Sequence, residues 1–492
     1  MHPPPIRRAI ESPLVVASNR GPVTFLPDEA GQLEPRRNTG GIVKPLAGVF
    51  SAEEGGTWVS SAMSDGDRML AKEPDLTGPG DLQLRFVVVD PDTYERFFDR
   101  VANGVLWRIH HSMSETGPVS EERSRDDWEA FEATNRAFAD VLDEAPRDAV
   151  FLVQDYQLPL VPHYLRALRP HARIVHFTHT PFAGPDAWRS APPWIREGVL
   201  RGMCASDVLG FQSRSWATNF LATVRAHTDA NVDLRARRLS TDGHEVRVRT
   251  FPVSVNVDQL RAAAMDPAAA AVRRSMARTQ TDQRLILRVD RLEPSKNILR
   301  GFQAFEQVLL RSPSWRGRAR YLALLTPSRQ ERDLDGGYGD ACLSEVERIN
   351  ARFGSEGWRP VTMRASQDPA STLAAYGCYD VMLANPLHDG MNLAALEGPV
   401  LNERSGVLVL SRGAGAYARF HRYALGVDPT DIDGTAAAIL QGLEMSEQDR
   451  TRRNRGLVRS IAGHTPSTWL ADQLETLDEV RGVDEPPASW IE

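Results

Sequence analysis

The 492-residue sequence has few cysteines and no long apolar run. Cys204, Cys342 and Cys378 lie far apart without a Cys-x-x-Cys pair, so they indicate neither a zinc site nor a disulfide framework, and we expect small buried side chains. No run approaches roughly 18 apolar residues, so no membrane span is expected. The N-terminal residues lack the apolar stretch of a signal peptide, which predicts a cytoplasmic protein.

Positive charge is also scarce, because 65 Asp and Glu residues outnumber 58 Lys and Arg residues and give a net charge of -7. A general nucleic-acid binder needs a positive surface that replaces counterions, so this class is excluded. The hydrophobic share of 41% and the charged share of 25% are typical of a folded, soluble protein. The length exceeds one ordinary core and predicts two domains of roughly 200 to 250 residues.

Short apolar runs rich in β-branched residues recur along the chain. They lie at 14–20, 149–156, 173–180, 207–213, 284–291, 321–329, 380–386 and 406–412. Because they are continuous rather than alternating, they predict parallel strands covered on both faces. Helical patterns lie between them; Trp128, Phe131, Phe138, Val141 and Leu142, for example, make one apolar stripe. The alternation predicts an α/β fold with two Rossmann-like, doubly wound parallel sheets.

The series of runs has a gap between residues 214 and 283, which contains a charged stretch and a last strand that leads into a linker. We place the domain boundary near Ser254. The expected organisation is an N-terminal domain at 12–254, a C-terminal domain at 255–464 and a helix at 465–484 that packs back on the N-terminal domain.

Polar residues stand where the apolar runs end. They are Arg20, Asp155, His179, Arg291, Arg329 and the loop of Asp389. Ligands of open α/β sheets bind outside the carboxyl ends of the strands. We therefore expect these residues to line one central cleft that the two domains face.

The segment RVDRLEPSKN places Arg291 and Lys296 on the loop after a strand, five residues apart. A guanidinium beside an ammonium suits a diphosphate. A solvated charged turn explains the same residues equally well.

The segment NPLHDGMNLAALEGP at 385–399 reads as a strand end, a turn and a helix. Free backbone N–H groups at the start of that helix favour anionic oxygens. Asp389 is suited to a sugar hydroxyl, and Glu397, about two turns into the helix, to vicinal hydroxyls such as those of ribose. Taken singly, these residues fit better a surface helix with Asp389 as its N-cap.

Histidines and tryptophans give weaker signals. His176 and His179 are three apart on a strand, so their side chains leave opposite faces and a shared metal is not expected. His179, at the tip, is suited to a hydrogen bond with substrate, although a structural role fits it as well. His110 and His111 are expected at the surface. The tryptophans that could stack on sugars, or more usually pack in the core, are Trp58, Trp107, Trp188 and Trp194.

Ten segments, in the family's order, make the chain similar to trehalose-6-phosphate synthases. These are retaining glycosyltransferases of the GT-B type, family 20. The segment VDRLEPSKN resembles most closely that of members of actinobacterial type. The similarity covers about residues 14 to 480. The segments are SNRGPV, TGGIVKPLAG, GVLW, VQDYQL, HFTHTPF, LGFQS, RVDRLEPSKN, TPSR, DGMNL and GVLVLSRGAGA.

The resemblance implies roles for the residues that match. Arg20 and Arg329 would grip the acceptor phosphate, Trp107 would form an acceptor wall, and Asp155 would hold acceptor hydroxyls near the reaction centre. His179 would contact the donor glucose, and with Asp155, Arg291 and Lys296 it would make up the catalytic set. The donor-binding set would be Gly41, Arg291, Lys296, Asp389, Gly390, Met391, Asn392, Leu393 and Glu397.

The implied reaction transfers glucose, with retention, from GDP-glucose or UDP-glucose to glucose 6-phosphate and gives trehalose 6-phosphate. The leaving diphosphate would accept the acceptor's proton on the same face, so paired carboxylates of glycosidase type are not needed. Protein cations would stabilise the diphosphate, so neither a metal nor a cofactor is expected. The expected partners are the two substrates, without nucleic acid or membrane, and a homo-oligomer is left open.

Three departures from the family pattern concern the substrates. Leu396 stands where many members have Lys, Ser61 where some have a second Trp, and Phe97 or Phe98 where others have an acceptor-side Tyr. They keep open a pseudo-glycosyltransferase or another phosphorylated acceptor, although the retained DGMN favours a hexose donor. A catalytically inactive sensing member is a third hypothesis, which the retained donor-site residues disfavour.

Overall fold

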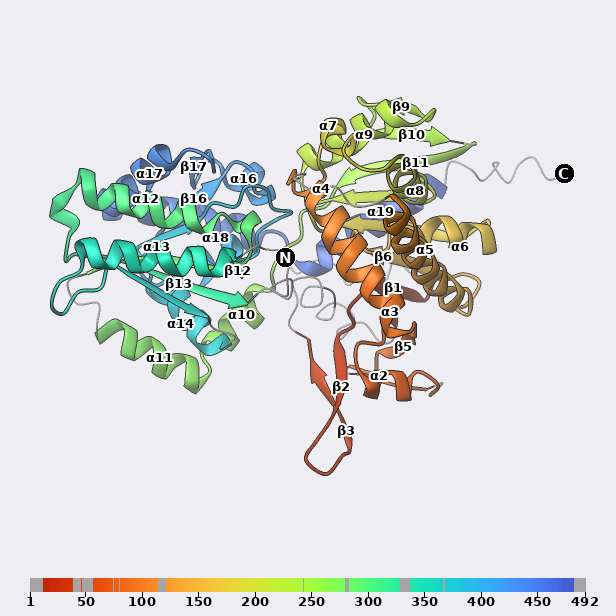
Figure 1. Cartoon of the computed structure of the whole chain (residues 1–492), viewed down its shortest axis with the longest axis horizontal. Helices are drawn as coiled ribbons and strands as arrows, with labels where there is room; N and C mark the ends of the chain where they lie inside the picture. Colours follow the sequence, from red (N-terminus) through yellow and green to blue (C-terminus); the bar gives the residue numbers. More distant parts are fainter. Residues whose placement is uncertain are drawn as a thin grey trace. The chain divides into compact units, whose positions relative to one another are not determined.

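The computed structural model describes residues 12–38, 46, 56–73, 75–78, 80–113, 121–241, 243–278, 283–327, 337–365 and 368–481. These residues belong to two compact units (Figure 1). One unit is the chain up to Val253 together with the chain from Pro466, and the other is Ser254–Thr465. Gly41 and Arg329, to which the sequence gives binding roles, lie outside the described residues.

The N-terminal unit is built on a nine-stranded sheet in the order β5-β4-β1-β6-β7-β8-β11-β10-β9. The strands from β5 to β11 are parallel, and β10 and β9 extend the sheet as antiparallel strands. Their bounds are β5 Gln83–Val87, β4 Thr57–Ser61, β1 Leu14–Ser18, β6 Val150–Gln154, β7 Arg173–Thr178, β8 Val208–Phe211, β11 His244–Thr250, β10 Arg238–Thr241 and β9 Asn231–Asp233. A separate antiparallel hairpin joins β2, Val23–Pro27, to β3, Leu33–Arg37.

Helices of this unit cover the sheet with the apolar stripes that the sequence predicts. Trp128, Phe131, Phe138 and Leu142 on α5 are buried, and Phe131 packs against Phe97. The helices are α2 Asp65–Leu70, α3 Pro91–Glu95, the π-helix η2 Arg96–Trp107, α4 Arg108–His110, α5 Glu121–Asp143, α6 Val161–Leu168, α7 Pro185–Trp188, α8 Pro193–Met203, α9 Arg214–His227 and α19 Pro466–Arg481.

Helix α19 contacts β7 and β8 of the N-terminal unit, although it follows the other unit in the sequence (Figure 1). The indole Nε1 of Trp469 donates a hydrogen bond to the carbonyl oxygen of Phe251 (3.1 Å), and its ring meets Phe177 edge-on with centroids 5.0 Å apart. Trp469 is fully buried, so its apolar area anchors the helix to the sheet.

The second unit has a six-stranded, wholly parallel sheet in the order β14-β13-β12-β15-β16-β17. Each residue of β15 and β16 is buried, as expected for continuous apolar strands. The strands are β12 Arg284–Leu292, β13 Ala319–Pro327, β14 Val361–Ala365, β15 Val381–Ala384, β16 Val407–Ser411 and β17 Leu425–Val427. Both units therefore confirm the predicted Rossmann-like α/β fold.

The helices of the second unit fall into two groups. Residues of α12, α13 and α17 share one core with the strands, and α14, α15 and α18 contact β12, β15 and β16. The bounds are α10 Val257–Ala264, α11 Pro267–Arg278, the 3-10 helix η3 Pro294–Lys296, α12 Ile298–Arg311, η4 Pro313–Trp315, α13 Tyr338–Phe353, α14 Pro369–Cys378, α15 Ala394–Leu401, α16 Gly415–Phe420, α17 Ile432–Glu444 and α18 Glu447–Ala462.

The cysteines and the hydrophobicity of the helices bear on two expectations from the sequence. All three cysteines lie in the described part of the chain, where they are buried and not disulfide-bonded, which confirms the expectation of small core residues. No helix in the described parts of the chain is long and apolar enough to cross a membrane.

Candidate active site

Asp155 and His179 stand at the carboxyl ends of the adjacent strands β6 and β7, and the loops bring them together. The carboxylate oxygen Oδ1 of Asp155 accepts hydrogen bonds from the backbone N–H of His179 (3.0 Å) and of Thr180 (3.3 Å). Asp155 is buried and has a φ of 72°, a left-handed conformation that residues other than glycine rarely adopt. Such strain occurs where the surrounding structure fixes a functional group.

The imidazole of His179 is held between two glutamine side chains. Its Nε2 lies 2.9 Å from Oε1 of Gln154, and its Nδ1 lies 3.4 Å from Nε2 of Gln212. If Nε2 carries the proton, it donates to Gln154 and Nδ1 accepts from Gln212, so both contacts are hydrogen bonds. Burial, together with the nearby His176, lowers the pKa of His179 to about 3. The ring is therefore neutral near pH 7, suited to hydrogen bonding rather than to proton donation as an imidazolium.

His110 and His111 are buried, so the prediction that they lie at the surface was wrong. His111 stacks on Trp107 with ring centroids 4.2 Å apart, and Nδ1 of His110 lies 2.8 Å from the carbonyl oxygen of Pro181. Burial lowers the pKa of His110 to about 4. Two adjacent polar residues gave no sign that both rings point into aromatic packing. Trp58 and Trp188 are also core residues, as is usual for tryptophan.

Lys296 and Asp389 form an ion pair in the second unit. Nζ of Lys296 lies 2.5 Å from Oδ2 of Asp389, and both residues are buried. Lys296 ends η3 after β12, and Asp389 follows β15, so adjacent strands supply the two charges. Arg291, at the end of β12, has an exposed guanidinium that pairs with buried Glu293 at 2.6 Å. Arg291 is thus exposed to solvent, whereas Lys296 is buried.

The Asp389 loop is fixed by close backbone contacts with the loop after β16. The N–H of Asp389 donates to the carbonyl oxygen of Gly413 (3.0 Å), and the N–H of Gly415 donates to the carbonyl oxygen of Asp389 (3.1 Å). A Cβ at Gly415 would lie 1.8 Å from the carbonyl oxygen of Gly390, so only glycine allows this approach. The glycines of the predicted GAGA segment therefore shape the loop.

Asn392, rather than Asp389, bonds the first turn of α15. Oδ1 of Asn392 accepts from the N–H of Ala395 (3.1 Å), and its Nδ2 donates to Oδ2 of Asp389 (3.1 Å). Asn392 has a φ of 70°, which asparagine tolerates better than most residues. The alternative that made Asp389 an N-cap was wrong. Asp389 instead combines its bond from Asn392 with the ion pair to Lys296.

Glu397 is half-buried in the first turn of α15, where Oε2 accepts a hydrogen bond from the hydroxyl of Tyr376 (3.3 Å). Burial, and then the charge of Glu397, raises the pKa of Tyr376 well above its usual value, so that the phenol stays a donor. Leu396 is fully buried, which explains an apolar residue where a lysine was expected. Met391 is buried and Leu393 is half-buried beside Asn392.

The sequence interpretation missed a buried polar group behind Lys296. Arg288 is fully buried; its Nη1 donates to the carbonyl oxygen of Lys296 (2.9 Å) and its Nε to the hydroxyl of Tyr321 (3.1 Å). Asp290 lies 3.5 Å from Nη1 of Arg288. Burial raises the pKa of Asp290 to about 6, against the opposing effect of Arg288 and Lys296. Arg288 and Asp290, charged residues at alternate positions in the middle of the strand, were the available signal.

We expect Asp290→Asn to raise the Tm above pH 7 and to flatten its pH dependence between pH 4 and 6. A carboxyl whose folded pKa exceeds its usual 3.8 favours the folded state at low pH, and this contribution is lost as the pH rises through about 6. The shift corresponds to at most about 3 kcal/mol. Thermal unfolding from pH 4 to 8 measures it, with Asp433→Asn, an exposed ion-pair residue, as the control. Parallel curves for wild type and Asp290→Asn would contradict it.

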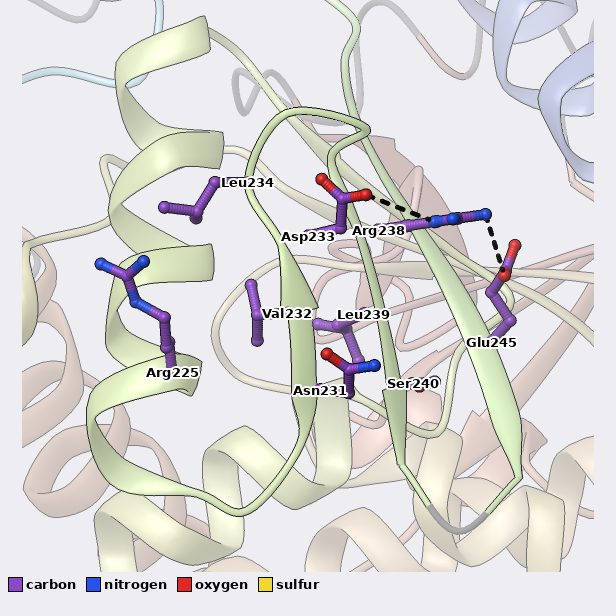
Figure 2. Close-up of a pocket in the computed structure, with 9 residues that line it drawn as sticks. All are labelled: Arg225, Asn231, Val232, Asp233, Leu234, Arg238, Leu239, Ser240 and Glu245. Carbon is purple, nitrogen blue, oxygen red and sulfur yellow. Dashed lines mark ion pairs between the residues drawn. The ribbon is translucent and has the colours of Figure 1, made fainter.

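A hollow of about 580 Å³ lies in the N-terminal unit, between α9 and the strands β9 and β10 (Figure 2). Arg238 there pairs with Asp233 at 3.8 Å and with Glu245 at 3.6 Å. None of the residues predicted for substrate lines it. Within the described ranges, no three His, Cys, Asp or Glu side chains gather as metal ligands.

The chain is similar to known proteins over nearly its whole length. The model of the family described as Glycosyltransferase family 20 matches residues 12–479. A trehalose-6-phosphate synthase of Mycolicibacterium paratuberculosis is 32% identical over 95% of this chain and 96% of its own length. A bifunctional trehalose-6-phosphate synthase/phosphatase of Thermoproteus tenax is 30% identical over 96% of this chain, which spans 64% of that protein.

The chain is also similar to a protein named for a different activity and to proteins of known structure. A validamine 7-phosphate valienyltransferase of Streptomyces hygroscopicus subsp. jinggangensis is 29% identical over 95% of this chain and 94% of its own length. An α,α-trehalose-phosphate synthase (UDP-forming) from Burkholderia xenovorans, in complex with glucose-6-phosphate, has a TM-score of 0.82 at 25% identity, covering 95% of this chain and all of that one. An E. coli protein bound with UDP-2-fluoro glucose has the same TM-score and identity, covering 96% and 99%. The chain belongs to glycosyltransferase family 20.

Proposed function

We propose that this chain transfers glucose, with retention, from GDP-glucose or UDP-glucose to glucose 6-phosphate and forms trehalose 6-phosphate. The observation that carries the proposal is the buried Lys296–Asp389 ion pair beside the start of α15. A lysine for a diphosphate and a carboxylate for a sugar hydroxyl are thereby held together before the donor binds. Relatives with the synthase activity in their names support the same substrates.

In the proposed reaction, the bond from the glucose anomeric carbon to the diphosphate oxygen breaks as the acceptor hydroxyl oxygen bonds to the same face of that carbon. The acceptor's proton passes to the departing phosphate oxygen. Lys296 and Arg291 neutralise the charge that develops on the diphosphate, and Glu397 binds the ribose. Neutral His179 exchanges one of its two glutamine partners for a hydroxyl of the donor sugar, the longer contact to Gln212 (3.4 Å) being the weaker one, and Asp155 orients the acceptor. Positioning and electrostatics supply the acceleration.

Product mass tests the proposed function directly. Incubation with GDP-glucose or UDP-glucose should release nucleoside diphosphate only when glucose 6-phosphate is present, and the product should have the mass of trehalose 6-phosphate. No product from any combination of these donors with glucose 6-phosphate would overturn the proposal. Thermal stabilisation by both substrates without product would instead indicate a binding-only member.

Arg20→Ala should raise the acceptor KM by about 10- to 100-fold, because a hydrogen bond to a charged group is worth about 1.5 to 3 kcal/mol. The donor KM should stay near the wild-type value. Initial rates at varied glucose 6-phosphate, with saturating donor, measure the effect. An unchanged acceptor KM would remove Arg20 from the phosphate site.

A second candidate is transfer to a phosphorylated cyclitol amine, as the name of the validamine relative suggests. The hydroxyl of buried Ser61 is already bonded to Asn19, and Phe98 has no hydroxyl, so neither side chain offers the acceptor the N–H or O–H that Trp and Tyr carry in other members. The same mass assay with an amino-cyclitol phosphate as acceptor distinguishes this reaction from sugar transfer.

A further inference from the structure

The turn after β1 carries Asn19 directly before Arg20, and the side chain of Asn19 bridges three elements. Its Nδ2 donates to the hydroxyl of Tyr94 (3.1 Å), and its Oδ1 accepts from the hydroxyl of Ser61 (2.8 Å). The Tyr94 hydroxyl in turn donates toward Sδ of Met63 (3.0 Å). Asn19 is 5% exposed and Ser61 is 2% exposed, so water cannot readily replace these partners. Both ends of the amide are satisfied, which fixes its orientation.

The backbone around Arg20 is anchored from both sides. The N–H of Ser61 donates to the carbonyl oxygen of Asn19 (3.2 Å), which ties the turn to β4. The hydroxyl of Ser18 donates to the carbonyl oxygen of Arg20 (2.8 Å) and itself accepts from Nε1 of Trp58 (2.8 Å). Arg20 therefore extends from a backbone with little freedom, while its own side chain is half-buried.

Tyr94 is held rigidly enough to act as a support for this turn. It lies on α3, where its ring stacks on Phe98 with centroids 5.6 Å apart and tilts against Phe97 at 5.9 Å. Burial raises the pKa of its phenol well above the usual value, so the hydroxyl is neutral at any working pH. The π-helix η2 that follows carries both phenylalanines, so aromatic packing and hydrogen bonding locate the same side chain.

The position of Tyr94 is informative because of its neighbours. In other family members, Trp and Tyr at these positions form a polar aromatic wall. Ser61 is too small to form such a wall, and Phe98 lacks the hydroxyl. Tyr94 places a phenolic hydroxyl beside Ser61 from one helical turn earlier than Phe98. The Tyr94 hydroxyl, however, bonds to the side chain of Asn19, so any effect on Arg20 passes through Asn19.

We infer that Tyr94 is a positioning residue for the acceptor: through Asn19 it fixes the turn that presents Arg20 to the acceptor phosphate. This inference rests on the proposed function, in which Arg20 binds that phosphate. Tyr94 lies outside the motifs shared with the family, and its hydroxyl affects acceptor affinity without having to touch the acceptor.

Tyr94→Phe should raise the acceptor KM about 3- to 10-fold with kcat and the donor KM unchanged, as expected when one hydrogen bond to a positioning amide is lost. Direct calorimetric titration of the full chain with glucose 6-phosphate should give the same loss of affinity. Tyr379→Phe is the matched control, because the buried Tyr379 hydroxyl has no hydrogen-bond partner among the residues that the structure describes. A changed donor KM, or an unchanged affinity for glucose 6-phosphate, would overturn the inference.

The double variant Arg20→Ala/Tyr94→Phe tests whether Tyr94 acts through Arg20. Residues that work through one another have non-additive effects, so Tyr94→Phe should have no further effect on acceptor affinity once Arg20 is absent. Additive losses would show an independent, merely structural role and would overturn the inference. If wild type binds no glucose 6-phosphate, the proposed acceptor has failed, which the titration distinguishes from a failure of the Tyr94 inference.

Discussion

Lys296→Ala should lower kcat/KM by about a thousandfold, the loss expected when a preorganised charge at a developing oxyanion is removed. The ammonium lies at the junction of η3 and α12 and is paired with Asp389 at 2.5 Å, so its position is set before substrate arrives. In the proposed donor complex, the diphosphate would supply a new partner for Lys296, and the carboxylate of Asp389 would accept from a sugar hydroxyl instead. The charge matters most as the diphosphate departs, so kcat should fall along with affinity.

A stability effect has to be separated from this catalytic one. Lys296→Ala leaves the carboxylate of Asp389 buried without its cation, and breaking a buried pair costs about 3 to 5 kcal/mol. The double variant Lys296→Ala/Asp389→Asn should recover much of the Tm while remaining inactive. Lys72→Ala, at an exposed lysine, serves as the activity control. Wild-type turnover by a folded Lys296→Ala enzyme would exclude Lys296 from the diphosphate site.

The parts of the fold that the sequence predicted are the buried parallel strands. β6, β15 and β16 are buried throughout and almost wholly apolar, as expected for strands covered on both faces, and such continuous apolar runs can be recognised in the sequence. The hairpin β2–β3 was missed, because β3, Leu33–Arg37, is mostly exposed and reads as a charged loop. The strands β9 and β10 escaped for the same reason. Their pairing partners, rather than their composition, make them strands.

The candidate site divides along a similar line. Arg291 lies at the carboxyl end of β12, and Lys296 and Asp389 lie in the segments after β12 and β15, so a general rule about strand ends found them. Arg288 and Asp290 lie inside β12, and their role depends on the neighbouring strands that bring Tyr321 and Asn385 to Arg288. Tyr94 was missed because its contact with Asn19 joins residues 75 positions apart. Such contacts follow from tertiary packing and leave no local pattern.

Asp155→Ala should lower kcat/KM by about a thousandfold, and Asp155→Asn by about a hundredfold, because small losses of position at a reacting centre have effects of this order. The carboxylate accepts from the N–H groups of both His179 and Thr180. Alanine removes Oδ1, the acceptor of both bonds, and still has to adopt a φ of 72°, which residues other than glycine, asparagine and aspartate avoid. Asparagine keeps the shape, one acceptor oxygen and the backbone conformation, but it removes the charge.

Asp155→Gly separates backbone strain from chemistry, because glycine adopts positive φ without cost. Its Tm should equal or exceed that of Asp155→Ala, whereas its activity should be equally low if the carboxylate itself is needed. Melting curves and initial rates on the three variants give both quantities. If Asp155→Gly recovered turnover, the left-handed turn that presents His179 would be the functional element and the carboxylate only its support. Loss of activity in all three, with the asparagine variant the least affected, would show that function needs both the acceptor oxygen, which asparagine keeps, and the charge, which it lacks.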